Sequence, residues 1–192
     1  GHTQDNPTIV VDPPVLWFRA WVEQVEAAVA QDLGTVRLAV DVETPDKADG
    51  KDEGDLNRED TSYRLLRVNF SVHPDEGITV PYAAEYVPLI ERLLRLPCPK
   101  VLWNKEYDQP RLVKAGHTCG GDWFDFMWAT HHLQSDVPAG LGFWAPFYSR
   151  FGPWKHLSTS NPGYYAACDS FQTERVGFGA ARDLMAAGQW EV

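Results

Sequence analysis

Two carboxylates, two positions apart, stand at the end of an apolar stretch of the chain. Asp41 and Glu43 close a run in which apolar residues alternate from Val36 onward. In a β-strand, side chains two positions apart project from the same face, so these two carboxylates must lie several ångströms apart. Two like charges that close are unfavourable unless a cation sits between them. The pair is therefore a candidate ligand set for a metal ion.

Two further patterns that contain an acid follow along the chain. Asn104 and Asp108 frame the sequence Asn-Lys-Glu-Tyr-Asp, in which Asn104 is expected to end a strand and Asp108 to open a helix. Tyr165 and Asp169 are four positions apart in a predicted helix, so the two side chains share one helix face. The spacings Asp-x-Glu, Asn-x-x-x-Asp and Tyr-x-x-x-Asp each occur once in the chain. Their combination is more specific than any one of them.

Taken in this order, the three patterns resemble the motifs of the DEDD superfamily of 3′–5′ exonucleases, also called DnaQ-like. Tyr165 before Asp169, in place of a histidine, indicates the DEDDy subtype. Within it, the chain looks most like the proofreading exonuclease domain of family A, phage-like DNA polymerases. The context of the motifs supports this, and the resemblance covers about residues 8–190. The supporting segments are DVET, ITVPY, NKEYDQPRL and GLGFWAPFYSRFGPWKH.

The resemblance implies an α/β fold, a ribonuclease-H-like mixed sheet flanked by helices. It also implies one 3′–5′ exonuclease domain over 1–192. Residues 1–7 would form a leader, within a polar, Pro-rich stretch that continues to residue 14. Residues 46–60 hold seven acidic and three basic residues, and are expected to form a mobile loop of unassigned role.

The resemblance also implies a two-metal hydrolysis of a phosphodiester with Mg²⁺ or Mn²⁺, since hard divalent cations take oxygen ligands. It implies that Asp41 bridges both ions, that Glu43 and Asp169 complete the site of the ion beside the attacking water, and that Asp108 serves the other ion. Tyr165 is too weak an acid to act as a base at neutral pH, so its hydroxyl would orient the attacking water.

Substrate contacts are expected from residues beside these motifs. The resemblance implies that Thr44 meets the terminal sugar, and that Asn104 positions Asp108 or touches the nucleotide. Arg111 and Lys114 follow Asp108 and could contact phosphates. Aromatic side chains and one lysine before the third motif are candidates for a single-strand channel: Phe143, Trp144, Phe147, Trp154 and Lys155. Asp125, before an apolar run, is interpreted as a helix cap rather than a ligand.

The pattern of apolar residues predicts the order helix, three strands, helix, strand and then helices. Three adjacent strands followed by a crossover helix indicate a mixed sheet covered by helices. The expected helices are 15–30, 86–96, 108–115, 124–133, 141–151 and 162–187, and the expected strands are 36–43, 64–72, 78–82 and 100–103.

Composition excludes several classes of protein. The chain of 192 residues is 44% hydrophobic and can bury a core, which argues against a disordered acidic chain despite a net charge of −10. No apolar run reaches the ~18 residues that a membrane helix needs. Three scattered cysteines indicate a reducing, intracellular compartment, expected to be a phage or bacterial-type host cytoplasm.

Three functions remain open at this stage. The first is a 3′–5′ exonuclease on single-stranded DNA or a DNA 3′ end, with a polymerase domain possible in the same parent chain. The second is an RNase D-like exoribonuclease. The third is a non-catalytic polymerase-docking module of the same fold, although a retired site should have lost an acid and this sequence keeps all four.

Overall fold

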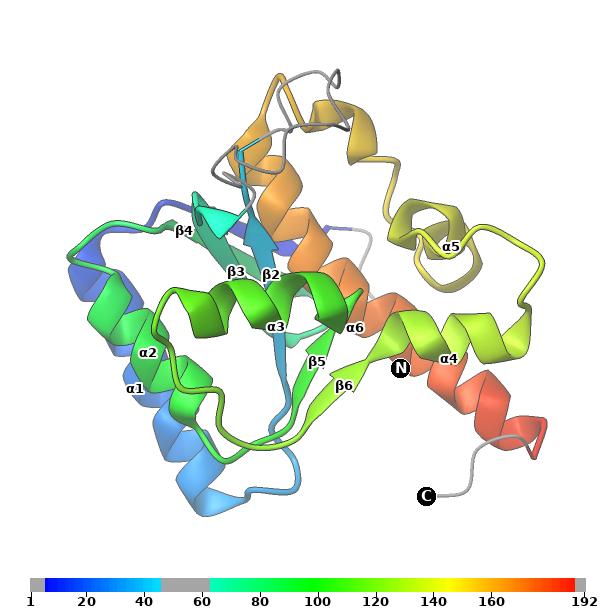
Figure 1. The fold of residues 1–192 in the computed structure, drawn as a ribbon, viewed down its shortest axis with the longest axis horizontal. Helices are drawn as coiled ribbons and strands as arrows, with labels where there is room; N and C mark the ends of the chain where they lie inside the picture. The colour runs from blue at the N-terminus through cyan, green and yellow to red at the C-terminus, as the bar shows by residue number, and fades with distance from the viewer. Residues whose placement is uncertain (1–5, 46–62, 189–192) are drawn as a thin grey trace, which may run out of the picture.

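The computed structural model describes residues 6–45 and 63–188. The expected acidic loop at 46–60 and most of the expected leader at 1–7 lie outside these residues. Figure 1 shows the described chain as one twisted sheet with helices on both of its faces. This is the predicted fold class, a mixed sheet flanked by helices.

Six strands form the sheet in the spatial order β1-β4-β3-β2-β5-β6. The pairs β2–β3 and β3–β4 are antiparallel, whereas β1–β4, β2–β5 and β5–β6 are parallel. The strands are β1 Thr8–Val11, β2 Leu38–Glu43, β3 Arg67–His73, β4 Glu76–Pro81, β5 Lys100–Leu102 and β6 Trp123–Asp125. The central position of β2 puts its carboxyl end, with Asp41 and Glu43, in the middle of one sheet edge.

The alternation in β2 assigns its two faces as the sequence predicts. Leu38, Val40 and Val42 pack into the main core. Ala39 contacts a second cluster on the opposite face, so Asp41 and Glu43 share that second face. The main core is built with helices α1 Val15–Gln31 and α2 Val87–Arg95 and the inner side of α3 Lys105–Lys114.

The second face is covered by the last helices of the chain. The long helix α6 Pro162–Ala186 packs along the sheet, with α4 Phe126–Leu133 and α5 Leu141–Tyr148 beside it. A short 3₁₀ turn, η2 Lys155–Leu157, lies between α5 and α6. The face of β2 that carries Asp41 and Glu43 therefore meets α6. This helix contains Tyr165 and Asp169.

Several elements differ from the sequence prediction: β3 begins at Arg67 rather than at 64, and α5 ends at Tyr148 rather than at 151. β1 lies within residues expected to form a polar leader, and β6 precedes α4 within residues expected to be helical. Both strands are at most four residues long, so neither shows a readable alternation. α3 begins at Lys105 rather than Asp108, which places Asp108 inside the helix. Within the described part of the chain, no helix combines the length and apolar character needed to cross a membrane.

Candidate active site

The five acid and tyrosine positions of the three motifs converge on one pocket. Asp41 and Glu43 come from β2, Asp108 from α3, and Tyr165 and Asp169 from the first turns of α6. Thr44 and Asn104, the two residues expected beside the motifs, line the same pocket. Arg111 is not among its lining residues.

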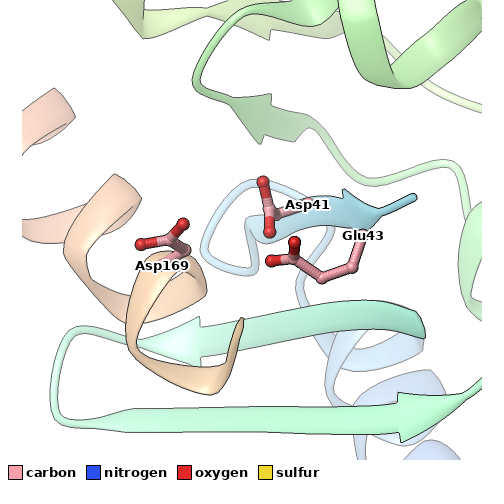
Figure 2. A group of neighbouring side chains, drawn as sticks. All are labelled: Asp41, Glu43 and Asp169. Carbon is pink, nitrogen blue, oxygen red and sulfur yellow. The ribbon is translucent and has the colours of Figure 1, made fainter. Parts of the chain in front are cut away.

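Three of the carboxylates are close enough to share a cation. Oxygen atoms of Asp41, Glu43 and Asp169 all lie within 4.8 Å of one another. Figure 2 shows Asp41 and Glu43 projecting from β2 toward Asp169 on α6. An all-oxygen donor set of this kind suits Mg²⁺ or Mn²⁺. Asp108 lies outside this group of three and faces Asp41 from α3.

The protein environment raises the pKa values of Asp41, Glu43 and Asp108. Burial, with the negative charge of Asp169 added, raises the pKa of Asp41 to about 7. Burial and the charges of Asp41 and Asp169 raise the pKa of Glu43 to about 9. Burial and Asp41 also raise the pKa of Asp108 well above its usual range. Crowded buried carboxylates of this kind are characteristic of sites that bind a cation.

The segment around Asn104 places Asp108. Asn104 adopts a left-handed conformation with φ of 76°, which asparagine tolerates better than most residues. The carboxylate of Asp125 accepts hydrogen bonds from the backbone amides of Asn104 and Lys105, both at 2.9 Å. It also accepts one from the amide of Met127, so the predicted role of Asp125 as a helix cap is confirmed. Asp108, 2% exposed, accepts a hydrogen bond from the backbone amide of Val42.

A buried polar row across the sheet orients the β2 acids. Asn69 on β3 is directly opposite Asp41, and Thr79 on β4 is directly opposite Asn69. The Asn69 Nδ2 donates to Asp41 Oδ2 at 2.6 Å and more weakly to Glu43 Oε1 at 3.4 Å. The hydroxyl of the buried Thr79 donates to Asn69 Oδ1 at 2.7 Å and so fixes which way the amide points. Sequence reasoning missed both residues, because only strand register brings them to the acids.

Replacing Asn69 by Ala is expected to lower kcat about 10–100-fold, because partners that orient metal ligands typically matter on this scale. Thr79→Val keeps the side-chain volume and should lower kcat less, since the amide would remain but lose its fixed orientation. Both can be measured as single-turnover rates on a labelled oligonucleotide, with Thr35→Val, an exposed threonine, as the control. Wild-type rates in the Asn69 variant would show that the row serves only the fold.

Two neighbouring side chains hold Asp169. The indole Nε1 of Trp154 donates to Asp169 Oδ1 at 2.5 Å, and the Lys155 Nζ lies 2.8 and 2.9 Å from the two Asp169 carboxylate oxygens. Lys155 also donates to the Tyr165 hydroxyl at 3.2 Å. Burial and the nearby carboxylates raise the pKa of Tyr165, which keeps its phenol protonated at any working pH. Both donors were expected only as parts of a substrate channel.

The opposite wall of the pocket is hydrogen-bonded to α3 through Tyr107. The hydroxyl groups of Thr44 and Tyr107 are hydrogen-bonded at 2.7 Å. Arg111 lies behind this wall. Its guanidinium stacks 3.4 Å from the Tyr107 ring centroid and donates to the Tyr107 carbonyl at 2.6 Å. Arg111, 8% exposed, thus supports Tyr107, whereas Lys114 stands over the Tyr63 ring. Of the expected channel residues, Trp144 and Trp154 are buried, while Phe143 and Phe147 are exposed.

No protein-family model matches this sequence, and no curated protein matches it either. Solved structures do. Escherichia coli RNase D, described as an exoribonuclease involved in structured RNA processing, matches with a TM-score of 0.62 and 16% identity, over 95% of this chain and 46% of that one.

Two further structures match at similar levels. The first is Pol1 from M. smegmatis, solved as the POL domain in complex with DNA primer-template and dNTP. It gives a TM-score of 0.63 and 14% identity over 93% of this chain and 28% of that one. The second is Brucella melitensis NrnC with bound Mg²⁺. It gives a TM-score of 0.58 and 19% identity over 80% of this chain and 75% of that one. The chain thus spans less than half of RNase D and under a third of Pol1.

At sequence identities this low, a structural match establishes only the fold. The chemistry has to be argued from the residues of the site. The strand order, the long last helix and the matched structures agree with the expectation drawn from the three motifs. The chain therefore has a ribonuclease-H-like fold, the architecture that it shares with the matched structures.

Proposed function

We propose that this protein is a metal-dependent 3′–5′ exonuclease that shortens DNA from a single-stranded or frayed 3′ end and releases 5′-mononucleotides. The observation that carries the proposal is the convergence of four carboxylates and one tyrosine, from three separate segments, on one pocket. A binding module that had given up chemistry would have no need to keep such a mutually repelling set of buried acids.

The donor set fits divalent cations. Asp41, Glu43 and Asp169 would hold one ion, because their oxygens already lie within 4.8 Å of one another. Asp41 and Asp108 would hold a second, with Asp41 shared between the two. When bound, such ions make a water molecule more acidic and stabilise the charge on the leaving oxygen. Mg²⁺ and Mn²⁺ both suit these ligands.

The other residues of the pocket position the substrate and the water. Tyr165 stays protonated and can orient the attacking water through its hydroxyl. Thr44 and Tyr107, hydrogen-bonded to each other, form the wall where the terminal nucleoside would lie. Asn104 and Trp103 line the same pocket beside them and supply polar and stacking contacts.

DNA is the proposed substrate because the three motifs and their context resemble the exonuclease domains of DNA polymerases. From the same resemblance we propose that the chain serves as a proofreading domain beside a polymerase. The polymerase would belong to the same parent protein or would be a separate partner. The likeness to RNase D supports a second candidate, an exoribonuclease. The 2′-hydroxyl of the terminal nucleotide would separate the two functions.

A time course on labelled oligonucleotides tests the proposal. DNA and RNA of the same sequence, labelled at the 5′ end, are incubated with the protein and Mg²⁺, Mn²⁺ or EDTA. A ladder that shortens from the 3′ end in DNA, and disappears with EDTA, is expected. Shortening of RNA alone would favour the exoribonuclease. Intact substrates with folded, metal-loaded protein would overturn the proposal.

The raised carboxyl pKa values predict an inverse dependence of stability on pH. Unfolded aspartate and glutamate titrate near 3.8 and 4.5, whereas Asp41 and Glu43 in the metal-free fold titrate at about 7 and 9. Between these limits the folded state binds more protons than the unfolded chain, so the free energy of unfolding falls as pH rises. The melting temperature in EDTA should therefore be lower at pH 9 than at pH 6.

A divalent ion binds the deprotonated carboxylates, so it should raise the melting temperature more at pH 9 than at pH 6. Thermal unfolding at both pH values, with EDTA or Mg²⁺, measures the effect. The double variant Asp41→Asn/Glu43→Gln removes both titrating groups. The part of the pH dependence of the melting temperature that Mg²⁺ reverses in the wild type should therefore become small. An equal response to Mg²⁺ at the two pH values would contradict the prediction.

A further inference from the structure

Lys155 places a positive charge beside the acidic pocket, against two of its lining residues, Tyr165 and Asp169. Its Nζ lies 2.8 and 2.9 Å from the two carboxylate oxygens of Asp169 and 3.2 Å from the hydroxyl of Tyr165. It also stands 4.8 Å from the centroid of the Tyr165 ring. The Lys155 ammonium thus contacts the polar side-chain atoms of both residues of the third motif, Tyr165 and Asp169.

The ammonium stands where a metal ligand is needed. Asp169 is one of the three acids whose oxygens could share a cation. Both of its oxygens are engaged by Lys155, and one of them also by Trp154. A divalent ion and an ammonium on the same carboxylate repel each other strongly at such short range. Binding of a divalent ion by Asp169 therefore favours displacement of Lys155.

Lys155 and Trp154 differ in their freedom to move. Trp154 is 3% exposed and packs in the cluster of buried residues around α5 and α6, so its indole is fixed. The Lys155 side chain is 40% exposed and belongs to the short turn η2 rather than to a long helix. Its flexible four-carbon stem can carry the charged end away from Asp169 while the backbone stays in place. The indole can remain as a fixed donor when the ammonium leaves.

The Lys155 stem packs against a glycine of α5. The stem runs beside α5 at Gly142, where a β-carbon would lie 3.1 Å from the Lys155 Cγ. The absence of a side chain at Gly142 leaves room for the stem. The charge also acts beyond Asp169, since it lowers the pKa values of Asp41 and Glu43 against the larger effect of burial. The charge of Lys155 thus acts on Asp41 and Glu43 as well as on its contact, Asp169.

We propose that Lys155 is a displaceable counter-ion of the active site. In the metal-free protein it neutralises Asp169. When a divalent ion binds, Lys155 gives up that carboxylate and offers its charge to a phosphate of the nucleic acid. The second step rests on the proposed exonuclease function, whereas the first concerns only the binding of a divalent cation.

The first step is tested by Mn²⁺ binding without substrate. Lys155→Met keeps the length of the stem and removes the charge. Because the ion no longer competes with an ammonium, the variant should bind Mn²⁺ about 3–10-fold more tightly in isothermal titration. Arg19→Met, an equal change of charge at an exposed position of α1, should leave the affinity unchanged. Equal or weaker binding by the Lys155 variant would overturn the proposal, since a residue that merely holds Asp169 in place would weaken binding when lost.

A second variant guards against a folding defect in the first. Lys155→Arg keeps the positive charge, so its Mn²⁺ affinity should stay at or below that of the wild type. Tighter binding by both variants would trace the effect to a change in packing and would also overturn the proposal. Circular dichroism establishes that each variant is folded before its affinity is measured.

The second step is tested at saturating Mn²⁺ on single-stranded DNA. Lys155→Met should lower kcat/KM about tenfold, and the slope of log KM against log salt should shrink by about one, as expected for the loss of one phosphate contact. An unchanged salt slope would overturn this step. If the wild type cleaves no nucleic acid, the proposed function fails, while the Mn²⁺ affinities still decide whether Lys155 is displaced.

Discussion

Asp41→Asn is expected to lower the exonuclease rate at least about 10³-fold and at the same time to stabilise the metal-free protein. Asp41 faces both neighbouring acids, since its charge raises the pKa values of Glu43 and Asp108. It is therefore the acid best placed to serve both proposed ions. Loss of a shared ligand removes charge that the reaction needs in its transition state, and effects of this size are typical for such groups.

The gain in stability follows from the same crowding. Asparagine has nearly the shape of aspartate, and its side-chain oxygen can still accept the hydrogen bond from Asn69. The substitution removes one of several like charges from a buried site. The melting temperature in EDTA at pH 8 should therefore rise, in the usual opposition between stability and activity at functional sites.

Single-turnover cleavage and thermal unfolding measure the two effects. Asp122→Asn is the matched control, because it makes the same chemical change at an exposed loop position. The control should keep wild-type activity. A rate within tenfold of the wild type for Asp41→Asn would remove the β2 pair from the proposed chemistry, even if the fold were intact.

Gly77→Ala should have the largest effect on stability among the conservative changes considered. Gly77 lies in β4, where α6 crosses the sheet, and a β-carbon there would lie 2.1 Å from the carbonyl oxygen of Ala167. That atom belongs to the backbone, so the clash can be relieved only if α6 moves away from the sheet. Overpacking of this kind typically destabilises by about 1–3 kcal/mol.

The same movement should impair the site. Ala167 is two residues from both Tyr165 and Asp169, so a shift of this part of α6 carries the third motif away from Asp41 and Glu43. Catalysis by positioned groups is sensitive to displacements of about 1 Å. We expect Gly77→Ala to lower kcat about 10²-fold, in addition to its loss of stability.

Urea unfolding and single-turnover rates at low temperature separate the two effects of Gly77→Ala. Gly152→Ala is the control, because Gly152 is exposed, lies outside the helices and has open space where its β-carbon would be. It should be close to neutral. Wild-type stability in the Gly77 variant would mean that α6 and β4 can separate without loss, contrary to their close contact.

The sequence predicts that the acids of the three motifs lie together, as they do in one pocket, because each motif is local. The spacing of Asp41 and Glu43 indicates a shared strand face, and the spacing of Tyr165 and Asp169 indicates a shared helix face. The alternation of β2 predicts which face is acidic. The two short edge strands could not be predicted in this way. β1 has only four residues. β6 ends at Asp125, which is also the N-cap of α4, so the sequence there indicates the start of a helix rather than a strand.

The residues that support the acids are invisible in the sequence because their role depends on contacts between distant segments. Asn69 is 28 positions from Asp41, and Trp154 is 15 positions from Asp169. A reader who knew the registers of β2–β3 and β3–β4 would find Asn69 and Thr79 in line with Asp41. Arg111 shows the opposite case: its sequence position suggests a phosphate contact, whereas its packing against Tyr107 gives it a supporting role.

The placement of the third motif on α6 has a consequence for folding during synthesis on the ribosome. Asp41 and Glu43 emerge early, but Asp169 and its two donors emerge more than a hundred residues later, and α6 also covers the face of the sheet on which the first acids lie. Until that helix docks, a nascent chain has neither a closed core nor a complete set of acids. Docking of α6 therefore closes the core and completes the set of acids in one event, so under the proposed function a nascent chain without α6 would not yet cleave nucleic acid.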